Sequence, residues 1–125
     1  MGIEAVVFDL DGVIIDTEEV WEDVRRGYVA EFGRSFRPDS QDRMMGMSTG
    51  EWSAHLADEV GVPRTAAQVA ADVLDRMAMR YRDALPLIPG SVETVRRLGE
   101  RYVLALASSS ARVLIDQVLE TAGLT

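Results

Sequence analysis

The stretch that decides the fold is VVFDLDGVIIDTE, residues 6–18, in which an apolar run leads directly into two aspartates, Asp9 and Asp11. Residues 3–8 are almost all apolar and do not alternate with polar residues, which predicts a strand buried on both faces, as in a parallel sheet. Ligands of open parallel sheets bind beyond the carboxyl ends of the strands. The two carboxylates therefore stand where a ligand site is expected.

A second apolar strand is expected at residues 103–107, and three serines, Ser108 to Ser110, follow it. If the two strands are neighbours, hydroxyl groups and a carboxylate pair face one crevice. Two carboxylates whose pKa values diverge suit a nucleophile and a general acid. A hard divalent cation with oxygen ligands would neutralise the crevice and admit a phosphate group.

The residues between the two strands carry helix signals and no strand signal. Asp16 with Glu19, Ser48 with Glu51, and Thr65 with Gln68 are spaced as capping pairs, and Gly33 and Gly61 are expected helix ends. Two further helices are predicted at residues 91–100 and 111–121. The predicted order is strand, helical insert, helix, strand, helix.

The composition excludes several classes of function. The chain has 125 residues, 47% of them hydrophobic, and a net charge of −8, so no electrostatic case exists for nucleic acid or an anionic membrane as a partner. It has no cysteine, which excludes disulfides and a thiol nucleophile. It has no apolar run of membrane-spanning length, and a cytoplasmic location is expected. The sequence leaves the oligomeric state open.

The motifs resemble those of the haloacid dehalogenase superfamily, in its phosphatase and phosphomutase branch. VVFDLDGVIIDTE resembles the first signature, VLALASSSA the second, and LPLIPGSVETVRRLGERY the stretch that joins cap and core. The β-phosphoglucomutase-like subfamily, which includes sugar phosphatases, is the most similar. The resemblance implies an α/β fold, with an incomplete Rossmannoid parallel-sheet core from residues 1–16 and 86–125. It implies an inserted α-helical cap at 17–85.

The resemblance also implies a role for each matching residue. Asp9 would be the nucleophile and a magnesium ligand. Asp11 would be the general acid and base, and its backbone carbonyl would bind the same Mg²⁺. Ser108 would hold the transferring phosphoryl group, assisted by the backbone amide of Ser109. The implied function is a magnesium-dependent phosphatase that hydrolyses a small phosphorylated metabolite, a sugar phosphate, through an aspartyl-phosphate intermediate. The acid at position 11 argues against dehalogenase chemistry.

Residues 1–125 lack two later signatures of this superfamily, a lysine and an acidic cluster that follow further strands. Every basic residue of the chain is arginine. We therefore expect the chain to be the N-terminal part of a longer protein and to be inactive alone. Two alternatives stay open, a phosphomutase and a catalytically inactive fragment or binding module. Trp21, Met45 and Thr49 stand near positions where such mutases carry basic residues, which favours a phosphatase over a mutase.

Other residues receive structural interpretations. Ser110 is predicted to cap the following helix. His55 is predicted to have a surface or structural role. Trp21 and Trp52 are expected in the core of the helical insert, with Trp21 near the first motif. The methionines of RMMGM, residues 43–47, are interpreted either as the lining of a substrate loop or as core filling. Four arginines are expected on solvated faces: Arg25, Arg26, Arg96 and Arg97.

Overall fold

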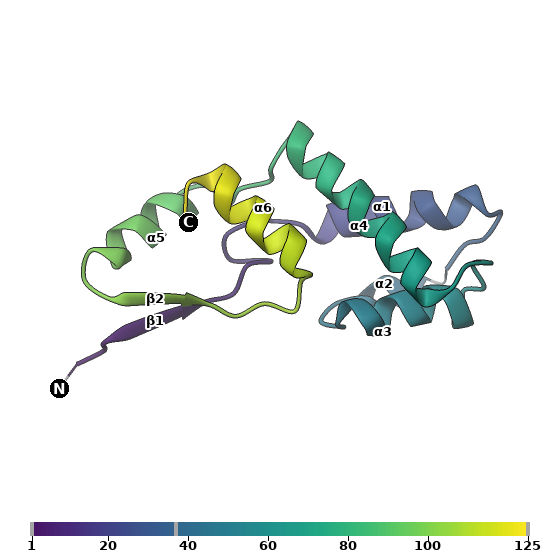
Figure 1. Cartoon of the computed structure of the whole chain (residues 1–125), viewed down its shortest axis with the longest axis horizontal. Coiled ribbons are helices and arrows are strands. Elements are labelled where there is room, and N and C mark those ends of the chain that lie inside the picture. The colour runs from purple at the N-terminus through teal and green to yellow at the C-terminus, as the bar shows by residue number, and fades with distance from the viewer. Residues whose placement is uncertain (1, 37, 125) are drawn as a thin grey trace.

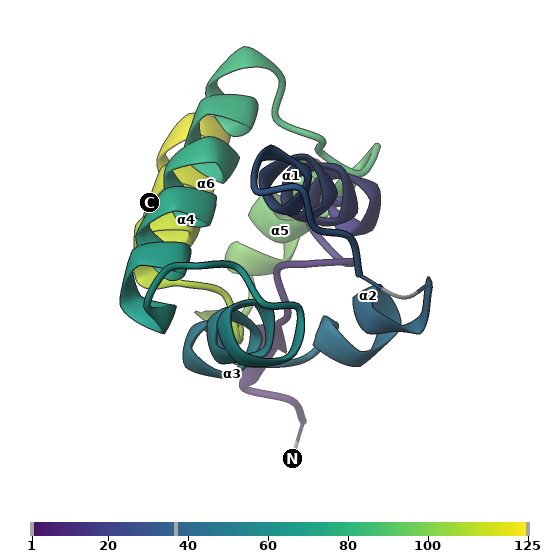
Figure 2. The same cartoon turned by 90° about the vertical axis from the view of Figure 1, so that its right-hand side faces the viewer.

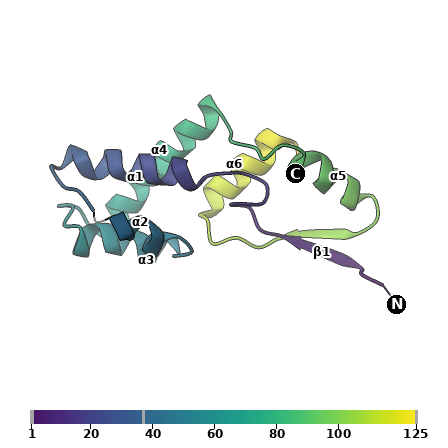
Figure 3. The same cartoon turned by 180° about the vertical axis from the view of Figure 1, so that it is seen from behind.

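The computed structural model describes residues 2–36 and 38–124, and it contains the predicted order of elements. The elements are β1 Ala5–Phe8, α1 Glu18–Glu31, α2 Pro38–Met44, α3 Thr49–Ala54, a π-helical turn His55–Glu59, α4 Ala66–Asp83, α5 Ser91–Gly99, β2 Val103–Leu106 and α6 Arg112–Ala122. The described residues between 17 and 85 form no strand, as predicted. Figures 1 and 3 show α1 to α4 at one end and the two strands at the other. We call residues 18–83 the helical region and the rest the strand region.

The two strands are adjacent and parallel, with Ala5 opposite Val103 and Phe8 opposite Leu106. The pairing continues past β2, because the Ala107 backbone N–H donates to the Phe8 carbonyl at 2.8 Å. Helices α5 and α6 lie on the same side of this strand pair (Figure 1). The expected α/β fold with a parallel sheet is therefore confirmed, and the residues that follow β1 and β2 emerge at the same edge.

Neither strand is buried on both faces, and that part of the prediction is wrong. Alternate residues of both strands are exposed, with Val7 64% and Val103 72% accessible. The reason is that α5 and α6 cover one face, on which Leu104 and Leu106 pack against the core. Within the described part of the chain, the opposite face of the strand pair stays in contact with solvent.

Two of the three predicted capping pairs form in the structure, and one does not. Ser48 and Thr65 form reciprocal capping boxes with Glu51 and Gln68, at the starts of α3 and α4. Asp16 does not cap α1; Thr17 occupies the N-cap position and makes no side-chain capping bond. The Thr17 hydroxyl donates to the Asp11 carboxylate.

A single buried cluster joins the two regions. It contains Val69, Val73 and Met77 of α4, which have no exposed surface, and Leu114 and Val118 of α6. Helices α4 and α6 are in contact, α6 lying behind α4 in Figure 2, and the Gln117 side chain donates to the Ala78 carbonyl at 2.9 Å. No helix among the described residues is both long enough and apolar enough to cross a bilayer.

Candidate active site

The turn after β1 is built by burial of its apolar residues. Leu10, Ile14 and Ile15 are at most 2% exposed and belong to the core cluster. The chain reverses between them at Gly12, whose φ of +83° suits glycine. The Gly12 N–H donates to the Ile15 carbonyl at 2.7 Å and closes the turn. Anchoring the apolar residues inward leaves the intervening polar side chains at the edge of the strand pair.

A second segment, residues 86–91, fixes the far end of this turn. The Asp16 N–H donates to the Pro86 carbonyl at 2.8 Å, and the Ile88 N–H donates to the Ile14 carbonyl at 2.9 Å. The Ser91 hydroxyl donates to the same Ile14 carbonyl at 3.0 Å. The proline-rich break before α5 is thus bonded to the end of the first motif, which holds the motif against the body of the protein.

Asp11 is the centre of a polar network between the two regions. One carboxylate oxygen accepts from the Thr17 hydroxyl, and the other accepts from the Ser110 hydroxyl at 2.6 Å. Burial raises the pKa of Tyr81, and the nearby Asp11 carboxylate raises it further. Because both carboxylate oxygens have a donor, the side chain of Asp11 is held in one orientation.

Asp9 has a more open environment. It is exposed, and its Oδ1 accepts from the Leu10 N–H at 2.7 Å. It does not line the cavity that Asp11 lines. Two oxygen-bearing acids in one turn fit Mg²⁺, which proteins commonly bind through one or two carboxylates, waters and a substrate phosphate. The described residues contain no group of three acidic, histidine or cysteine side chains that would form a complete metal cage.

The three serines after β2 make different contacts. The half-buried Ser108 uses its hydroxyl to accept from the Ser110 N–H at 3.1 Å. Ser109 is exposed and lines a cavity with Asp11. Ser110 does not cap α6, because Ala111 occupies the N-cap position and no side chain caps it. The predicted capping role of Ser110 is therefore wrong, and its hydroxyl bonds Asp11 instead.

The cavity at Asp11 lies between the two regions, and we call it the junction cavity. Its volume is about 60 Å³. Asp11, Ser109 and Ser110 line it from the strand region. Trp21, Arg25 and residues 44–47 line it from the helical region. The methionine stretch thus lies at a cavity, as one of its two interpretations expects, while Met44 is also buried in the core cluster.

The placement of Arg25 contradicts the sequence prediction. Arg25 is 3% exposed, whereas a solvated face was expected. Its guanidinium carbon lies 4.7 Å from the ring centre of Trp21 and 4.9 Å from that of Trp52. Both tryptophans are buried and meet edge to face at 5.7 Å, so their expected place in the core is confirmed. Arginine packs on indole faces through cation–π attraction, and this pairing explains its burial.

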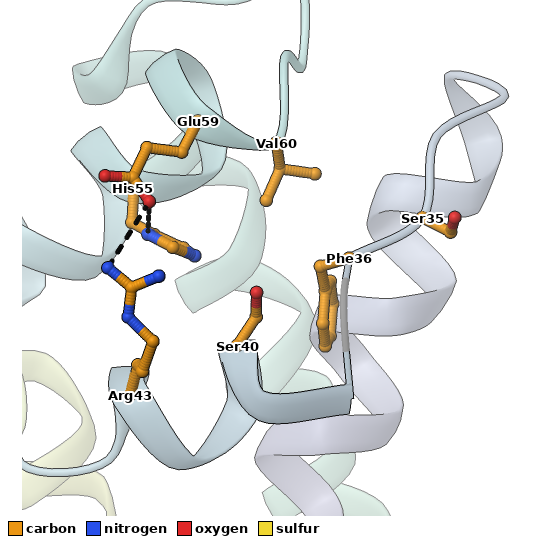
Figure 4. Close-up of a pocket in the computed structure, with 7 residues that line it drawn as sticks. All are labelled: Ser35, Phe36, Ser40, Arg43, His55, Glu59 and Val60. Carbon is orange, nitrogen blue, oxygen red and sulfur yellow. Dashed lines mark ion pairs between the residues drawn. The ribbon is translucent and has the colours of Figure 1, made fainter.

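A second cavity, of about 460 Å³, lies within the helical region. Figure 4 shows Arg43 and His55 both directed at Glu59, at N–O distances of 3.6 Å and 2.9 Å. His55 is buried, and its Nδ1 makes this contact within the π-helical turn, as a structural role predicts. Asp9, Asp11 and the three serines do not line this cavity. The candidate active site is therefore the edge of the strand pair and not the second cavity.

Three residues of the site escaped sequence reasoning: Thr17, Arg25 and Ser110. The Ser110–Asp11 bond joins positions 99 residues apart, so no local pattern encodes it. In the sequence, Thr17 resembles an ordinary helix cap. Its hydrogen bond to Asp11 forms only when the turn after β1 folds. The one available signal for Arg25 is that it follows Trp21 by four residues, a helical spacing that places the two side chains on one face.

The comparisons with known proteins agree with this geometry. A model of the family described as haloacid dehalogenase-like hydrolase matches residues 6–125. The chain belongs to this family. The match includes both signatures, the helical region between them and the serines that follow β2.

Several relatives are phosphatases. The chain is 30% identical over 123 residues to hexitol phosphatase B of Escherichia coli, covering 94% of this chain and 54% of that protein. It is 28% identical over 109 residues to the phosphorylated carbohydrates phosphatase of Thermotoga maritima, covering 86% and 50%. The chain therefore spans about half the length of these curated relatives.

Solved structures share the fold. The β-phosphoglucomutase of Clostridium difficile superposes with a TM-score of 0.77 at 20% identity, covering 99% of this chain and 58% of that one. CbbY of Rhodobacter sphaeroides, solved in complex with phosphate, superposes with a TM-score of 0.79 at 19% identity, covering 95% and 56%. At these identities the similarity establishes the fold.

Proposed function

We propose that this chain carries the nucleophile half of a magnesium-dependent phosphatase that hydrolyses a small phosphorylated metabolite, in the first instance a sugar phosphate. The observation that carries the proposal is the meeting of the β1 turn and the β2 serines at one edge of a parallel strand pair, through the Ser110–Asp11 hydrogen bond. The phosphatase relatives support it. In this proposal residues 17–85 act as a cap over a core made of 1–16 and 86–125.

The proposed reaction has two steps. An Asp9 carboxylate oxygen attacks phosphorus, the ester bond to the leaving group breaks, and Asp11 gives the leaving oxygen its proton. Asp11 then removes a proton from a water molecule, whose oxygen attacks phosphorus and releases phosphate with free Asp9. The exposure of Asp9 suits a nucleophile that must meet substrate. The two hydroxyl donors to Asp11 would keep its carboxyl group oriented through both steps.

Asp9, through its carboxylate, and Asp11, through its backbone carbonyl, would hold the Mg²⁺. The ion would supply charge neutralisation to the phosphate. In this proposal Ser108 and the backbone amide of Ser109 bind the phosphoryl oxygens. Because the Ser108 hydroxyl accepts from the Ser110 N–H, its own proton can be donated to a phosphoryl oxygen.

The first experiment replaces Asp9 by Asn in the natural protein and assays a generic phosphate ester with magnesium. Asn is nearly isosteric but cannot form the acyl phosphate, so hydrolysis should fall to background. Asp16→Asn, a neighbouring exposed acid, is the matched control and should keep activity. Wild-type turnover in Asp9→Asn would refute the nucleophile assignment.

Asp11→Asn tests the proposed role of Asp11 as general acid and base. The substitution removes the proton donor but keeps the backbone carbonyl, so turnover should fall by about 10²–10⁴-fold, the range for a lost general acid. Magnesium binding, measured by calorimetry, should change little. A loss of magnesium affinity as large as the loss of turnover would contradict this division of roles.

Residues 1–125 alone should turn over phosphate esters orders of magnitude more slowly than hexitol phosphatase B assayed alongside. The reason is that charge neutralisation is most of what a protein contributes to phosphoryl transfer, and the described residues offer neither a lysine nor a third metal-binding acid at the site. Robust magnesium-dependent turnover by this chain that disappears in Asp9→Asn would overturn the expectation of inactivity.

A further inference from the structure

Two methionines of the described chain are exposed, and they lie in different surroundings. Met79 is 55% exposed and Met45 is 40% exposed. Met44 and Met77 are at most 1% exposed. Because the chain has no cysteine, the described sulfur atoms most open to oxidation are those of Met45 and Met79. Met79 belongs to α4, whereas Met45 lines the junction cavity with Asp11.

The side chain of Gln41 joins the Met45 sulfur to the Arg25 guanidinium. Its Nε2 donates to Met45 Sδ at 3.6 Å, and its Oε1 accepts from Arg25 Nη1 at 3.5 Å. Both contacts are weak, since a thioether sulfur is a poor acceptor and 3.5 Å is long for a bond between nitrogen and oxygen. The sulfur and the guanidinium therefore lie at the two ends of one amide group, and both residues line the junction cavity.

Arg25 has hydrogen-bond donors that the described chain does not satisfy. It is 3% exposed, and its guanidinium packs on the rings of Trp21 and Trp52, which accept no strong hydrogen bond. Within residues 2–36 and 38–124 it forms no ion pair, and its Nε has no hydrogen-bond partner. Burial lowers the pKa of Arg25 to about 10, so the side chain is still a cation at neutral pH. A strong acceptor placed in the cavity would therefore gain a charge-assisted hydrogen bond.

Oxidation of Met45 by hydrogen peroxide would create such an acceptor from the chain itself. The sulfur lone pair attacks one peroxide oxygen, the O–O bond breaks and a sulfur–oxygen bond forms. The thioether loses two electrons, and the proton of the transferred oxygen passes to the departing hydroxide, which leaves as water. Reduction by a dithiol reverses the change and yields a disulfide and water. A sulfoxide is polar and its oxygen is a strong acceptor, whereas a thioether sulfur is a weak one.

We propose that Met45 is a redox modification site, at which the sulfoxide oxygen accepts a hydrogen bond from the Arg25 guanidinium and occupies the junction cavity beside Asp11. Oxidation ties the segment after α2 to α1 at the wall of the cavity, and enzymatic reduction of the sulfoxide releases it. The modification itself does not depend on the proposed function. Only its effect on turnover rests on that function, in which Asp11 is a catalytic residue.

The test locates the added oxygen and follows the Arg25 guanidinium. The natural protein, Met45→Leu and Met79→Leu would be treated with hydrogen peroxide, and peptide mass spectrometry would locate each gain of one oxygen atom. Leucine is close to methionine in size but has no sulfur, and Met79 is the matched control because it is also exposed. Nitrogen-15 NMR of the arginine Nε–H groups reports on Arg25, whose signal is identified by its loss in Arg25→Met and in Arg25→Lys.

Met45 and Met79 should both gain oxygen before the buried Met77 does. The Arg25 Nε–H signal should move on oxidation of wild type and of Met79→Leu, stay in place in Met45→Leu, and return after treatment with methionine sulfoxide reductase and a dithiol. Met45→Gln, whose amide oxygen imitates the sulfoxide, should move the signal without peroxide. Oxidation of Met45 that leaves the Arg25 signal in place, or a shift that persists in Met45→Leu, would overturn the proposal.

Turnover of a generic phosphate ester separates this inference from the proposed function. Oxidation should lower the turnover of wild type and of Met79→Leu by about tenfold, the factor that one hydrogen bond to a charged group contributes, and leave Met45→Leu at its own untreated rate. If the Arg25 signal moves in a protein that has no phosphatase activity before oxidation, the phosphatase proposal fails and the modification site stands. If the protein is a phosphatase and oxidation of Met45 changes neither the signal nor turnover, the modification site fails alone. A moved signal with unchanged turnover would overturn the blocking of the cavity.

Discussion

The helical region and the strand region differ in how completely they bury their apolar side chains. In the helical region, Val69, Val73 and Met77 of α4 have no exposed surface. In the strand region, Val7 is 64% and Val103 72% exposed, so half of each strand contributes little to the core. A cavity of about 180 Å³, lined by residues of β1, β2 and α6, also remains on the covered side.

The residues of the proposed site lie in the less buried region. Asp9, Asp11 and Ser108 to Ser110 follow the two strands, whereas the largest group of fully buried side chains belongs to the helices. The two regions meet at Thr17, which lies in the first motif, precedes α1 and donates to Asp11. The Thr17–Asp11 hydrogen bond therefore links the orientation of Asp11 to the start of the helical region.

The largest effect is expected from Met77→Ala in α4. Met77 has no exposed surface, and truncating a buried methionine should lower the free energy of unfolding by about 2–5 kcal/mol. Met79, on the same helix and 55% exposed, is the matched control, and Met79→Ala should cost less than about 0.5 kcal/mol. Urea unfolding followed by circular dichroism measures both. Equal losses would show that the helical region is not the better-packed one.

An intermediate effect is expected at the junction, from Thr17→Val. The substitution keeps the shape of a side chain that is 1% exposed but removes its hydrogen bond to a carboxylate, which should cost about 1.5–3 kcal/mol. Thr94, exposed on α5, provides the control substitution Thr94→Val, for which little change is expected. If the Thr17→Val protein were as stable as wild type, the Thr17–Asp11 hydrogen bond would not contribute to the stability of the fold.

The smallest effect is expected from Val103→Thr in β2. This side chain is 72% exposed, so adding a hydroxyl should change the free energy of unfolding by less than about 0.5 kcal/mol. The same substitution at the fully buried Val73 should cost about 1–3 kcal/mol, because the new hydroxyl loses its hydration. If Val103→Thr proved as costly as Val73→Thr, the outer face of the sheet would be covered in the natural protein.

Much of the fold could be predicted from local patterns. The parallel pairing followed from two apolar runs separated by helical segments, and Gly33 and Gly61, the expected helix ends, adopt the left-handed conformation. The capping boxes at Ser48 and Thr65 were correct because both partners lie within one turn of helix. Helix α2 was not predicted, since its seven residues are too short for a clear apolar period.

The candidate site was predicted only in part. The sequence pointed to Asp11 and Ser109, which the fold brings to one cavity, and to Asp9, which the fold leaves outside it. It misjudged Ser110 and Arg25. A serine just before a helix commonly caps it, but the Ser110 hydroxyl bonds Asp11 instead. An arginine on a helix is commonly exposed to solvent, but Arg25 packs against two tryptophan rings.

The sequence by itself determined where the two strands and most of the helices lie, which family the motifs resemble, and which acids stand at the end of β1. Those features depend on interactions between residues close in the chain, or on motifs that can be read residue by residue. Only the tertiary structure decided that Ser110 and Thr17 hold Asp11 and that Arg25 is buried beside it. Such contacts form between distant segments, because packing brings together side chains whose separation along the chain carries no signal.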